Sequence, residues 1–281
     1  CGRLREGRSW VIWPQAAAQP RSASWGGSLS RDADGTYHLL ANTMCQANVS
    51  RGNATYVSCY HSQGTQIIHA TSTAAKGPFQ FENVAMGPST YNPHIVMLPN
   101  GSWLMTFGNV NNPTPGMPVC TGSTNATTPA AGAPHTGGIG FATASTPGAP
   151  WRVVTPDPLL NFHPELGGAT NPSLATLANG TLLLAYRYTH GKKVGNEAVA
   201  VAAAESVSGP WRLITTDVLP SNIWGEDPHI SRSARGLRII FHNLTSFATR
   251  TDSSPGGYAF SRDGATWFVG ASAPYGKAIQ W

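Results

Sequence analysis

Three segments of the chain align with one another without gaps, and this internal repeat restricts the possible folds more than any other feature of the sequence. Each segment carries Asn-Pro or Asp-Pro near its start, ends in Gly and is followed by a short apolar run. The segments are residues 91–101, 170–180 and 226–236, followed by the runs 103–107, 182–186 and 237–241. An extended stretch, a Gly-containing turn and a second apolar stretch indicate a β-hairpin. The chain therefore repeats one β-hairpin unit.

A fourth, looser copy spans residues 25–40 and lacks the proline. A second repeat follows each hairpin, with an apolar strand, a run of small residues and then Gly-Pro-aromatic or a close relative of it. Its copies are residues 67–79, 139–151 and 199–211, and the fourth, 258–267, ends in Ser-x-Asp-Gly-x-Thr-Trp. In that turn we expect Asp263 to accept backbone N–H bonds and Trp267 to pack beneath the sheet, as Trp151 and Trp211 do in their copies.

Units of at least three strands, starting near Gly26, Asn92, Asn171 and Asp227, fit the blades of a propeller. We therefore predict an all-β fold, a five-bladed β-propeller with four evident blades. The strand 8–14 and residues 273–281 would be the edges of a partial fifth blade. Residues 1–281 would then form a single propeller domain, a fragment that lacks part of its last blade.

Composition excludes several other classes of protein. Charged residues make up only 11% of the chain, and Gly and Pro number 31 and 22, which argues against coiled coils and helical bundles. The longest apolar stretch, 198–204, is too short to span a membrane. The net charge is +5, but the basic residues are scattered rather than clustered, which argues against nucleic acid. Such a basic surface suits an acidic sugar, or has no ligand at all.

Cysteines and glycosylation sequons favour the secretory pathway or the extracellular space. Six N-x-S/T sequons occur, and the four cysteines lack zinc-type spacing. We expect Cys45 and Cys59 to form a disulfide because a short loop with two sequons separates them, which leaves Cys1 and Cys120 as the other pair. The protein is thus expected to be a secreted glycoprotein with disulfides.

The chain resembles the five-bladed propeller glycosidases of the family 43, 62, 32, 68 and 117 type, chiefly family 43. The resemblance rests on Asn/Asp-Pro at the start of innermost strands, on Asp-Gly-Thr-Tyr-His-Leu at 34–39 and on Ala-x-Ser before Gly-Pro-Phe/Trp. It implies a carbohydrate partner and two carboxyl groups flanking a glycosidic bond. In the family pattern Asp-Pro opens the first two blades and Glu-Gly-Pro the third. This chain departs from the pattern, because Gly26, Asn92 and Asn171 hold those positions.

Glu226 has the register of the family's Glu, two residues before Pro228, and is the candidate general acid. Asp227 follows it, and the alternation of side chains along a strand predicts that Asp227 points to the other face or along the backbone. A partner carboxylate would then come from elsewhere, and Glu165 is the candidate. Arg187 would bind a substrate carboxylate or, the slightly favoured reading, neutralise Glu226.

Other side chains near the expected strand starts are candidates for contact with a saccharide. Aromatic platforms and polar groups are the types that sugars use. The candidates are Trp25, Tyr91, Asn92, His94, Asn171, Trp224, His229 and His242. We expect no metal site and no cofactor, although His94 and His229, at equivalent positions of two repeats, leave a central Ca²⁺ or other cation open.

Two functions remain open from the sequence. The first is a glycoside hydrolase with Glu226 as acid. The second is a noncatalytic propeller that kept the sugar-binding site, and a sialidase-like propeller fits less well. Fold alone does not decide between them.

Overall fold

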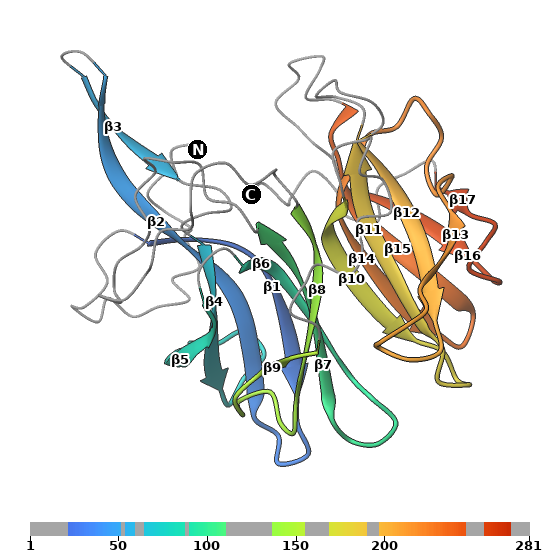
Figure 1. Ribbon diagram of the computed structural model, residues 1–281, viewed down its shortest axis with the longest axis horizontal. Coiled ribbons are helices and arrows are strands. Elements are labelled where there is room, and N and C mark those ends of the chain that lie inside the picture. Colours follow the sequence, from blue (N-terminus) through green and yellow to red (C-terminus); the bar gives the residue numbers. More distant parts are fainter. Residues whose placement is uncertain are drawn as a thin grey trace. The chain divides into compact units, whose positions relative to one another are not determined.

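The computed structural model describes residues 22–51, 54–59, 65–87, 90–110, 137–154, 169–189, 197–245 and 256–270. These residues form four antiparallel sheets, each built from strands that follow one another along the chain (Figure 1). The first contains β1 (Ser22–Arg31), β2 (Tyr37–Arg51), β4 (Thr65–Ser72) and β5 (Gln80–Met86), with β3 (Ala54–Cys59) paired to β2. The second contains β6 (Thr90–Met97), β7 (Trp103–Val110), β8 (Gly137–Ala144) and β9 (Arg152–Val153).

The third and fourth sheets repeat this order. The third contains β10 (Ala169–Thr176), β11 (Leu182–Thr189), β12 (Glu197–Ala204) and β13 (Arg212–Thr215). The fourth contains β14 (Gly225–Ser233), β15 (Gly236–Asn243), β16 (Gly256–Ser261) and β17 (Phe268–Val269). Four sequential antiparallel strands are the blade of a propeller, so the repeat predicted from sequence is confirmed four times. No helix within the described ranges is long and apolar enough to cross a membrane.

The chain divides into two compact units. The first holds the first sheet and the start of β6, up to Pro93. The second holds His94–Gly108, β8 and β9, and the third and fourth sheets.

The hairpin turns show why the repeat has its sequence. In the first three sheets a backbone N–H bonds to the carbonyl oxygen four residues later, from Asp32 to Thr36, Leu98 to Ser102 and Leu177 to Thr181. The glycine before the last residue has a left-handed φ of 82° to 95° in these turns, which matches the three-residue hairpin with a glycine bulge. In the fourth sheet Ser233 pairs with Gly236, so this turn is shorter.

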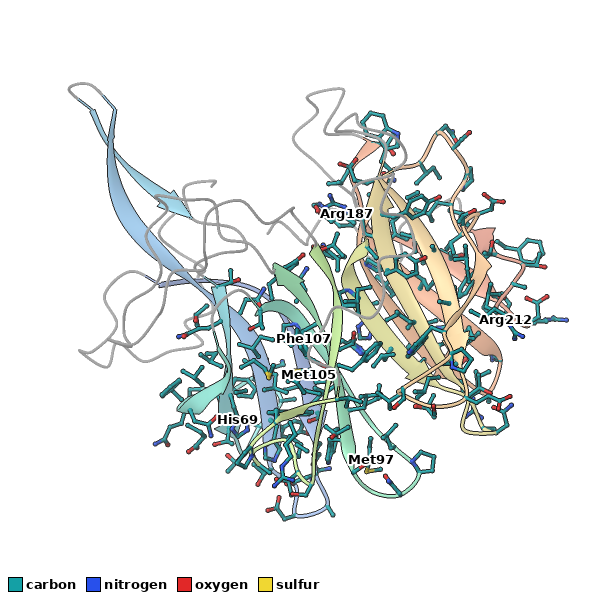
Figure 2. All side chains as sticks on the ribbon, viewed as in Figure 1. His69, Met97, Met105, Phe107, Arg187 and Arg212 are labelled. Carbon is teal, nitrogen blue, oxygen red and sulfur yellow. The ribbon has the colours of Figure 1, made fainter. Side chains whose placement is uncertain are left out.

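The core of the second unit lies on both faces of the third sheet. On β11, Leu183 and Ala185 belong to a cluster shared with the fourth sheet, while Leu184 and Tyr186 belong to a cluster shared with β7 and β8. Alternate residues thus enter different cores, which is why β11 and β12 read as continuous apolar runs. Met105 and Phe107 are buried on β7 (Figure 2).

The turn predicted around Asp263 is confirmed. Its Oδ1 accepts hydrogen bonds from the backbone N–H of Ala265 (2.9 Å) and Thr266 (2.8 Å) and from the Ser261 hydroxyl (2.9 Å). These bonds, the Thr266 N–H first, lower the pKa of Asp263 to about 2. Trp267 packs against the core, and Trp211 stacks on Phe141 with ring centroids 5.0 Å apart.

Several expectations lie outside the described residues. Glu165, Cys1, Cys120 and the two edges of the expected fifth blade are among them. β2 and β3 pair with Gln46 opposite Cys59, which places Cys45 and Cys59 on neighbouring strands, one residue out of direct register. Their side chains are not described, so the disulfide stays a prediction.

Candidate functional site

The four repeat anchors share an unusual backbone conformation. Gly26, Asn92, Asn171 and Asp227 have φ values of 63°, 48°, 49° and 49°. At Gly26, Asn171 and Asp227 the register between the first two strands shifts, so each of these three anchors sits at a β-bulge. Left-handed backbone favours Gly, Asn and Asp over other residues. The anchors therefore carry these residue types for a conformational reason, whatever chemistry they perform.

In the first unit the anchors pack against one another. A Cβ added at Gly26 would lie 2.8 Å from Oδ1 of Asn92. Asn42 of β2 bonds twice to Asn92: its Nδ2 donates to the Asn92 Oδ1 (3.1 Å), and its Oδ1 accepts from the Asn92 N–H (2.9 Å). Asn92 is thus bound within the fold, and sequence reasoning missed Asn42, its partner.

In the second unit the equivalent positions bring charged groups together. Asn171 donates from Nδ2 to Oδ1 of Asp227. Arg187 lies on β11, opposite Thr170 of β10 (Figure 2), and its Nη1 donates a hydrogen bond to Oε1 of Glu226. The Arg187 and Glu226 side chains are 22% and 20% exposed, so this ion pair is mostly shielded from water. The predicted pairing of Arg187 with Glu226 is confirmed.

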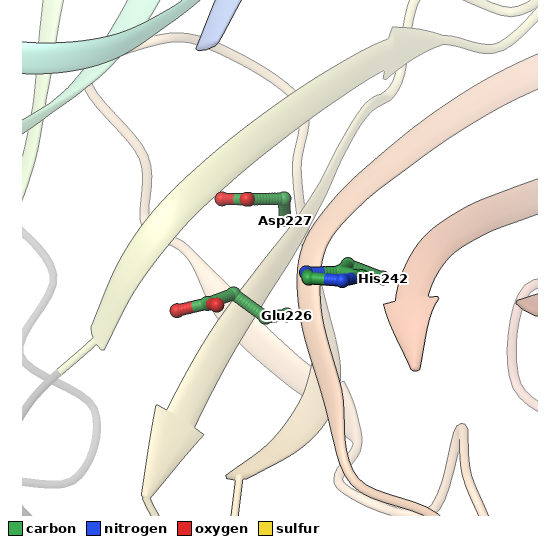
Figure 3. Close-up of side chains that lie close together, drawn as sticks. All are labelled: Glu226, Asp227 and His242. Atoms are coloured by element: carbon green, nitrogen blue, oxygen red, sulfur yellow. The ribbon is translucent and has the colours of Figure 1, made fainter. Parts of the chain in front are cut away.

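Strand alternation predicts that Asp227 points away from Glu226, but the structure places the two side chains close together. One ligand atom from each of Glu226, Asp227 and His242 lies within 4.8 Å of the other two. Figure 3 shows both carboxyl groups pointing the same way, with His242 on the neighbouring strand β15. The prediction was wrong because the bulge and the left-handed φ of Asp227 interrupt the alternation.

His242 completes this cluster as a neutral donor and acceptor. It lies opposite Glu226 in the strand register, the position that Arg187 has opposite Thr170 and Asn42 opposite Trp25. Burial lowers the pKa of His242, and the Glu226 carboxylate acts in the opposite direction. A neutral imidazole has one N–H donor and one acceptor nitrogen, and sugar hydroxyls match both.

The cluster is less suited to a metal ion than to hydrogen-bonding ligands. Its three side chains have the oxygen and nitrogen donors that a divalent cation uses. However, the Arg187 guanidinium already lies against the Glu226 carboxylate, and Asn171 donates a hydrogen bond to an oxygen of Asp227. Both contacts disfavour a second cation there.

His94 and His229 lie close together, as their shared repeat position predicts. Their ring centroids are 4.8 Å apart in an edge-to-face arrangement, and His229 is exposed. His94 is buried, and its Nδ1 accepts a hydrogen bond from the Leu174 N–H (3.1 Å). Ser173 has the same position in the next repeat and accepts from the Ile230 N–H (3.0 Å). The two bonds link successive sheets, so His94 has a structural role.

This structural role predicts a pH effect on stability. Burial, followed by the charge of His229, lowers the pKa of His94 to about 3, from an ordinary value of 6.5. The unfolded chain therefore takes up a proton below pH 6.5 that the folded chain refuses, and stability is lost as pH falls from 6.5 toward 3. Between pH 7 and pH 5 we expect His94 to cost about 2 kcal/mol.

Urea unfolding at both pH values measures this loss. His94→Asn is the control, because its Oδ1 still accepts the Leu174 N–H but has no proton to gain. Burial also lowers the pKa of His69 in the first unit, but that group is present in both proteins and cancels. Equal pH dependence of the two proteins would contradict the assignment.

The aromatic candidates have different positions. Trp224 precedes β14 and is partly buried, and its backbone N–H donates a hydrogen bond to the Thr245 hydroxyl (2.9 Å). Tyr91 is partly buried at the start of β6, in the first unit. Trp25 lies on β1, and its side chain is outside the described atoms. Trp224 is therefore the aromatic candidate next in sequence to the cluster of the second unit.

Sheet order, the anchors and the turns together define the class of protein: an all-β propeller, with four blades described, whose first strands each carry a residue of left-handed φ. No family model matches the sequence, and no curated protein matches it.

Solved structures do share the fold. A family 117 glycoside hydrolase of the marine bacterium Zobellia galactanivorans is 16% identical over 90% of this chain and 70% of its own, with a TM-score of 0.65. A thermostable family 43 glycoside hydrolase is 12% identical over 90% and 74%, with a TM-score of 0.56. A family 62 hydrolase in complex with xylotriose is 11% identical over 92% and 72%, with a TM-score of 0.58. The fold is that of the five-bladed propeller glycoside hydrolases, at low identity.

Proposed function

We propose that this protein is a glycoside-hydrolase-like carbohydrate-active protein that binds an oligo- or polysaccharide at Glu226, Asp227 and His242. The observation that carries the proposal is the convergence of two carboxylates and an imidazole within 4.8 Å at one strand start, in a fold shared with glycoside hydrolases. Carboxylates accept hydrogen bonds from sugar hydroxyls, and charge-assisted bonds are the stronger kind. Trp224 is the aromatic group that would stack on the sugar ring.

Hydrolysis is the second candidate function, with Glu226 as the acid and Glu165 as its partner. Glu226 and Asp227 do not form an inverting pair by themselves, because such a pair is about 6.5–9.5 Å apart to admit a water, and these carboxylates have oxygens within 4.8 Å. Glu226 is already bonded to Arg187, so a role as the acid requires the substrate to displace Arg187 from Glu226.

Calorimetric titration with xylotriose and a panel of plant and algal oligosaccharides tests the site. We expect Glu226→Gln and Asp227→Asn each to weaken binding at least tenfold, because each loses a charged acceptor worth about 1.5–3 kcal/mol. Glu205→Gln, an exposed glutamate of the same unit, is the matched control and should bind like the wild type. Unchanged affinity in both site variants, or no binding by the wild type, would refute the proposal.

Turnover of aryl glycosides and of the same oligosaccharides separates the two functions. Cleavage that Glu226→Gln abolishes supports hydrolysis with Glu226 as the acid. Cleavage that survives the substitution removes Glu226 from that role. Saturable binding without cleavage identifies the noncatalytic form.

A further inference from the structure

A second polar site lies at the other end of strand β14. Glu226 and Arg232 are six residues apart on this strand, a distance of about 20 Å along an extended chain. At the Arg232 end, a hollow of about 400 Å³ lies between the β14–β15 turn, the β10–β11 turn and the segment after β16. The residues that line it are Leu177, Arg232, Ser233, Ala234, Arg235, Gly236, Leu237, Arg262 and Asp263.

Three arginines share this hollow with a single carboxylate, that of Asp263, so the positive charges outnumber the negative one. Arg232, Arg235 and Arg262 are all exposed, and no hydrogen bond or ion pair of their guanidinium groups occurs within the described part of the chain. Asp263 is the acidic residue of the lining, and its carboxylate already accepts three hydrogen bonds within its own turn. Three like charges around one hollow repel one another, and a bound anion would relieve that repulsion.

The short fourth turn creates this arrangement. In the other three sheets the turn has a Gly bulge, whereas Ser233 pairs directly with Gly236 here. The Ser233 hydroxyl accepts the Arg235 N–H (3.2 Å) and donates to the Gly236 carbonyl (3.2 Å), which fixes the turn. Arg262 comes from the Ser-x-Asp-Gly-x-Thr-Trp turn, whose backbone Asp263 holds in place. Two ordered turns therefore present the arginines.

We propose that this hollow, the arginine pocket, binds the sulfate or carboxylate group of an acidic saccharide. Guanidinium groups match both anions because they donate paired parallel hydrogen bonds to two oxygens. The partly buried Leu177 adds apolar surface to the lining, which suits the C–H face of a sugar. The volume fits one or two sugar residues, whereas nucleic acid binding uses a long row of phosphate contacts.

The anion site rests on the arginines alone, and the choice of a saccharide rests on the proposed function. The arginine pocket is separate from the Glu226 cluster, so a polysaccharide chain would meet the protein at two places. The second contact would raise the effective concentration of the chain at the first.

Binding of three size-matched probes to the full chain tests the arginine pocket. The probes are trigalacturonate, a sulfated galactose trisaccharide and uncharged galactotriose. We expect Arg235→Gln/Arg262→Gln to weaken binding of at least one acidic probe tenfold or more. Arg238→Gln, an exposed arginine of β15 outside the pocket lining, should change it less than twofold. Which acidic probe binds distinguishes carboxylate from sulfate.

Further measurements separate this site from the proposed function. Glu205→Gln, outside both sites, should leave binding of the acidic probe unchanged, and Arg235→Gln/Arg262→Gln should leave binding of uncharged xylotriose at the Glu226 cluster unchanged, so each site can fail alone. Equal loss in the Arg238→Gln control, equal affinity for galactotriose or no binding of either acidic probe would overturn the proposal. Two outcomes would overturn the assignment to a saccharide. One is that inorganic sulfate binds as tightly as the sulfated trisaccharide, and the other is that a (dT)15 oligonucleotide displaces the acidic probe at equal concentration.

Discussion

Arg187→Met is expected to lower the free energy of unfolding by about 2–3 kcal/mol, since it leaves the Glu226 carboxylate mostly shielded from water without its cation. Removal of one partner of a buried ion pair costs about 3–5 kcal/mol, and the partial exposure of this pair reduces that range. Chemical denaturation measures the change. The nearby Asp227 carboxylate adds repulsion to the unpaired Glu226.

A double variant identifies the origin of this loss. Arg187→Met/Glu226→Gln removes the uncompensated charge and should recover most of the lost free energy. Arg212→Met, an exposed arginine of β13 (Figure 2), should stay within about 0.5 kcal/mol of the wild type. If the double variant is no more stable than Arg187→Met, the loss comes from packing and the ion pair is not its cause.

Gly257→Ala is expected to destabilise the fourth sheet by about 3 kcal/mol through overpacking. Gly257 lies opposite Phe241 in the strand register, and an added Cβ would lie 2.2 Å from Cζ and 2.4 Å from Cε2 of that ring. Phe241 is only 3% exposed and packs in the core cluster, so its ring has little room to move. Thermal and urea unfolding measure the loss.

A smaller residue at position 241 should relieve this clash. Phe241→Ala by itself costs about 3–5 kcal/mol, but in combination with Gly257→Ala the total loss should be smaller than the sum of the two. Gly87→Ala is the control, because an added Cβ there has no atom within 4 Å. Additive losses in the double variant would show that the two positions do not meet.

The sheets could be predicted from the sequence because the same pattern of strand, Gly-containing turn and strand occurs several times along the chain. The Gly-containing turns, the short apolar runs and the Asp263 turn each depend on a few neighbouring residues, and the structure agrees with the pattern in each case. The Arg187–Glu226 pair was one of two readings of Arg187, which follows the apolar run 182–186 and has an opposite charge to Glu226. The orientation of Asp227 was predicted wrongly, because we assumed regular strand alternation across a bulge. The backbone dihedral angle of Asp227 shows that interruption, and the sequence does not.

The roles of Asn42 and Ser173 were also missed, and here the signal was present in the sequence. Asn42, Arg187 and His242 have equivalent places in their hairpins, but the fourth turn is shorter and hides the correspondence. Ser173 has the same repeat position as His94, yet serine and histidine look unrelated until both accept a backbone N–H from the next sheet. The hydrogen bond to the next sheet is thus kept at equivalent positions, while the side chain that accepts it differs.

The left-handed anchors have a consequence for how such a site changes its charge. Asn and Asp have nearly the same shape and both tolerate the φ of about 49° found at Asn171 and Asp227. Exchange of one for the other alters the net charge beside Glu226 and His242 by one unit and keeps a residue type that the left-handed backbone tolerates. Asp227→Asn would remove a negative charge there, whereas Asn171→Asp would remove the donor to Asp227 and place two carboxylates against each other. The backbone conformation of the anchors therefore does not by itself fix the charge at the strand starts.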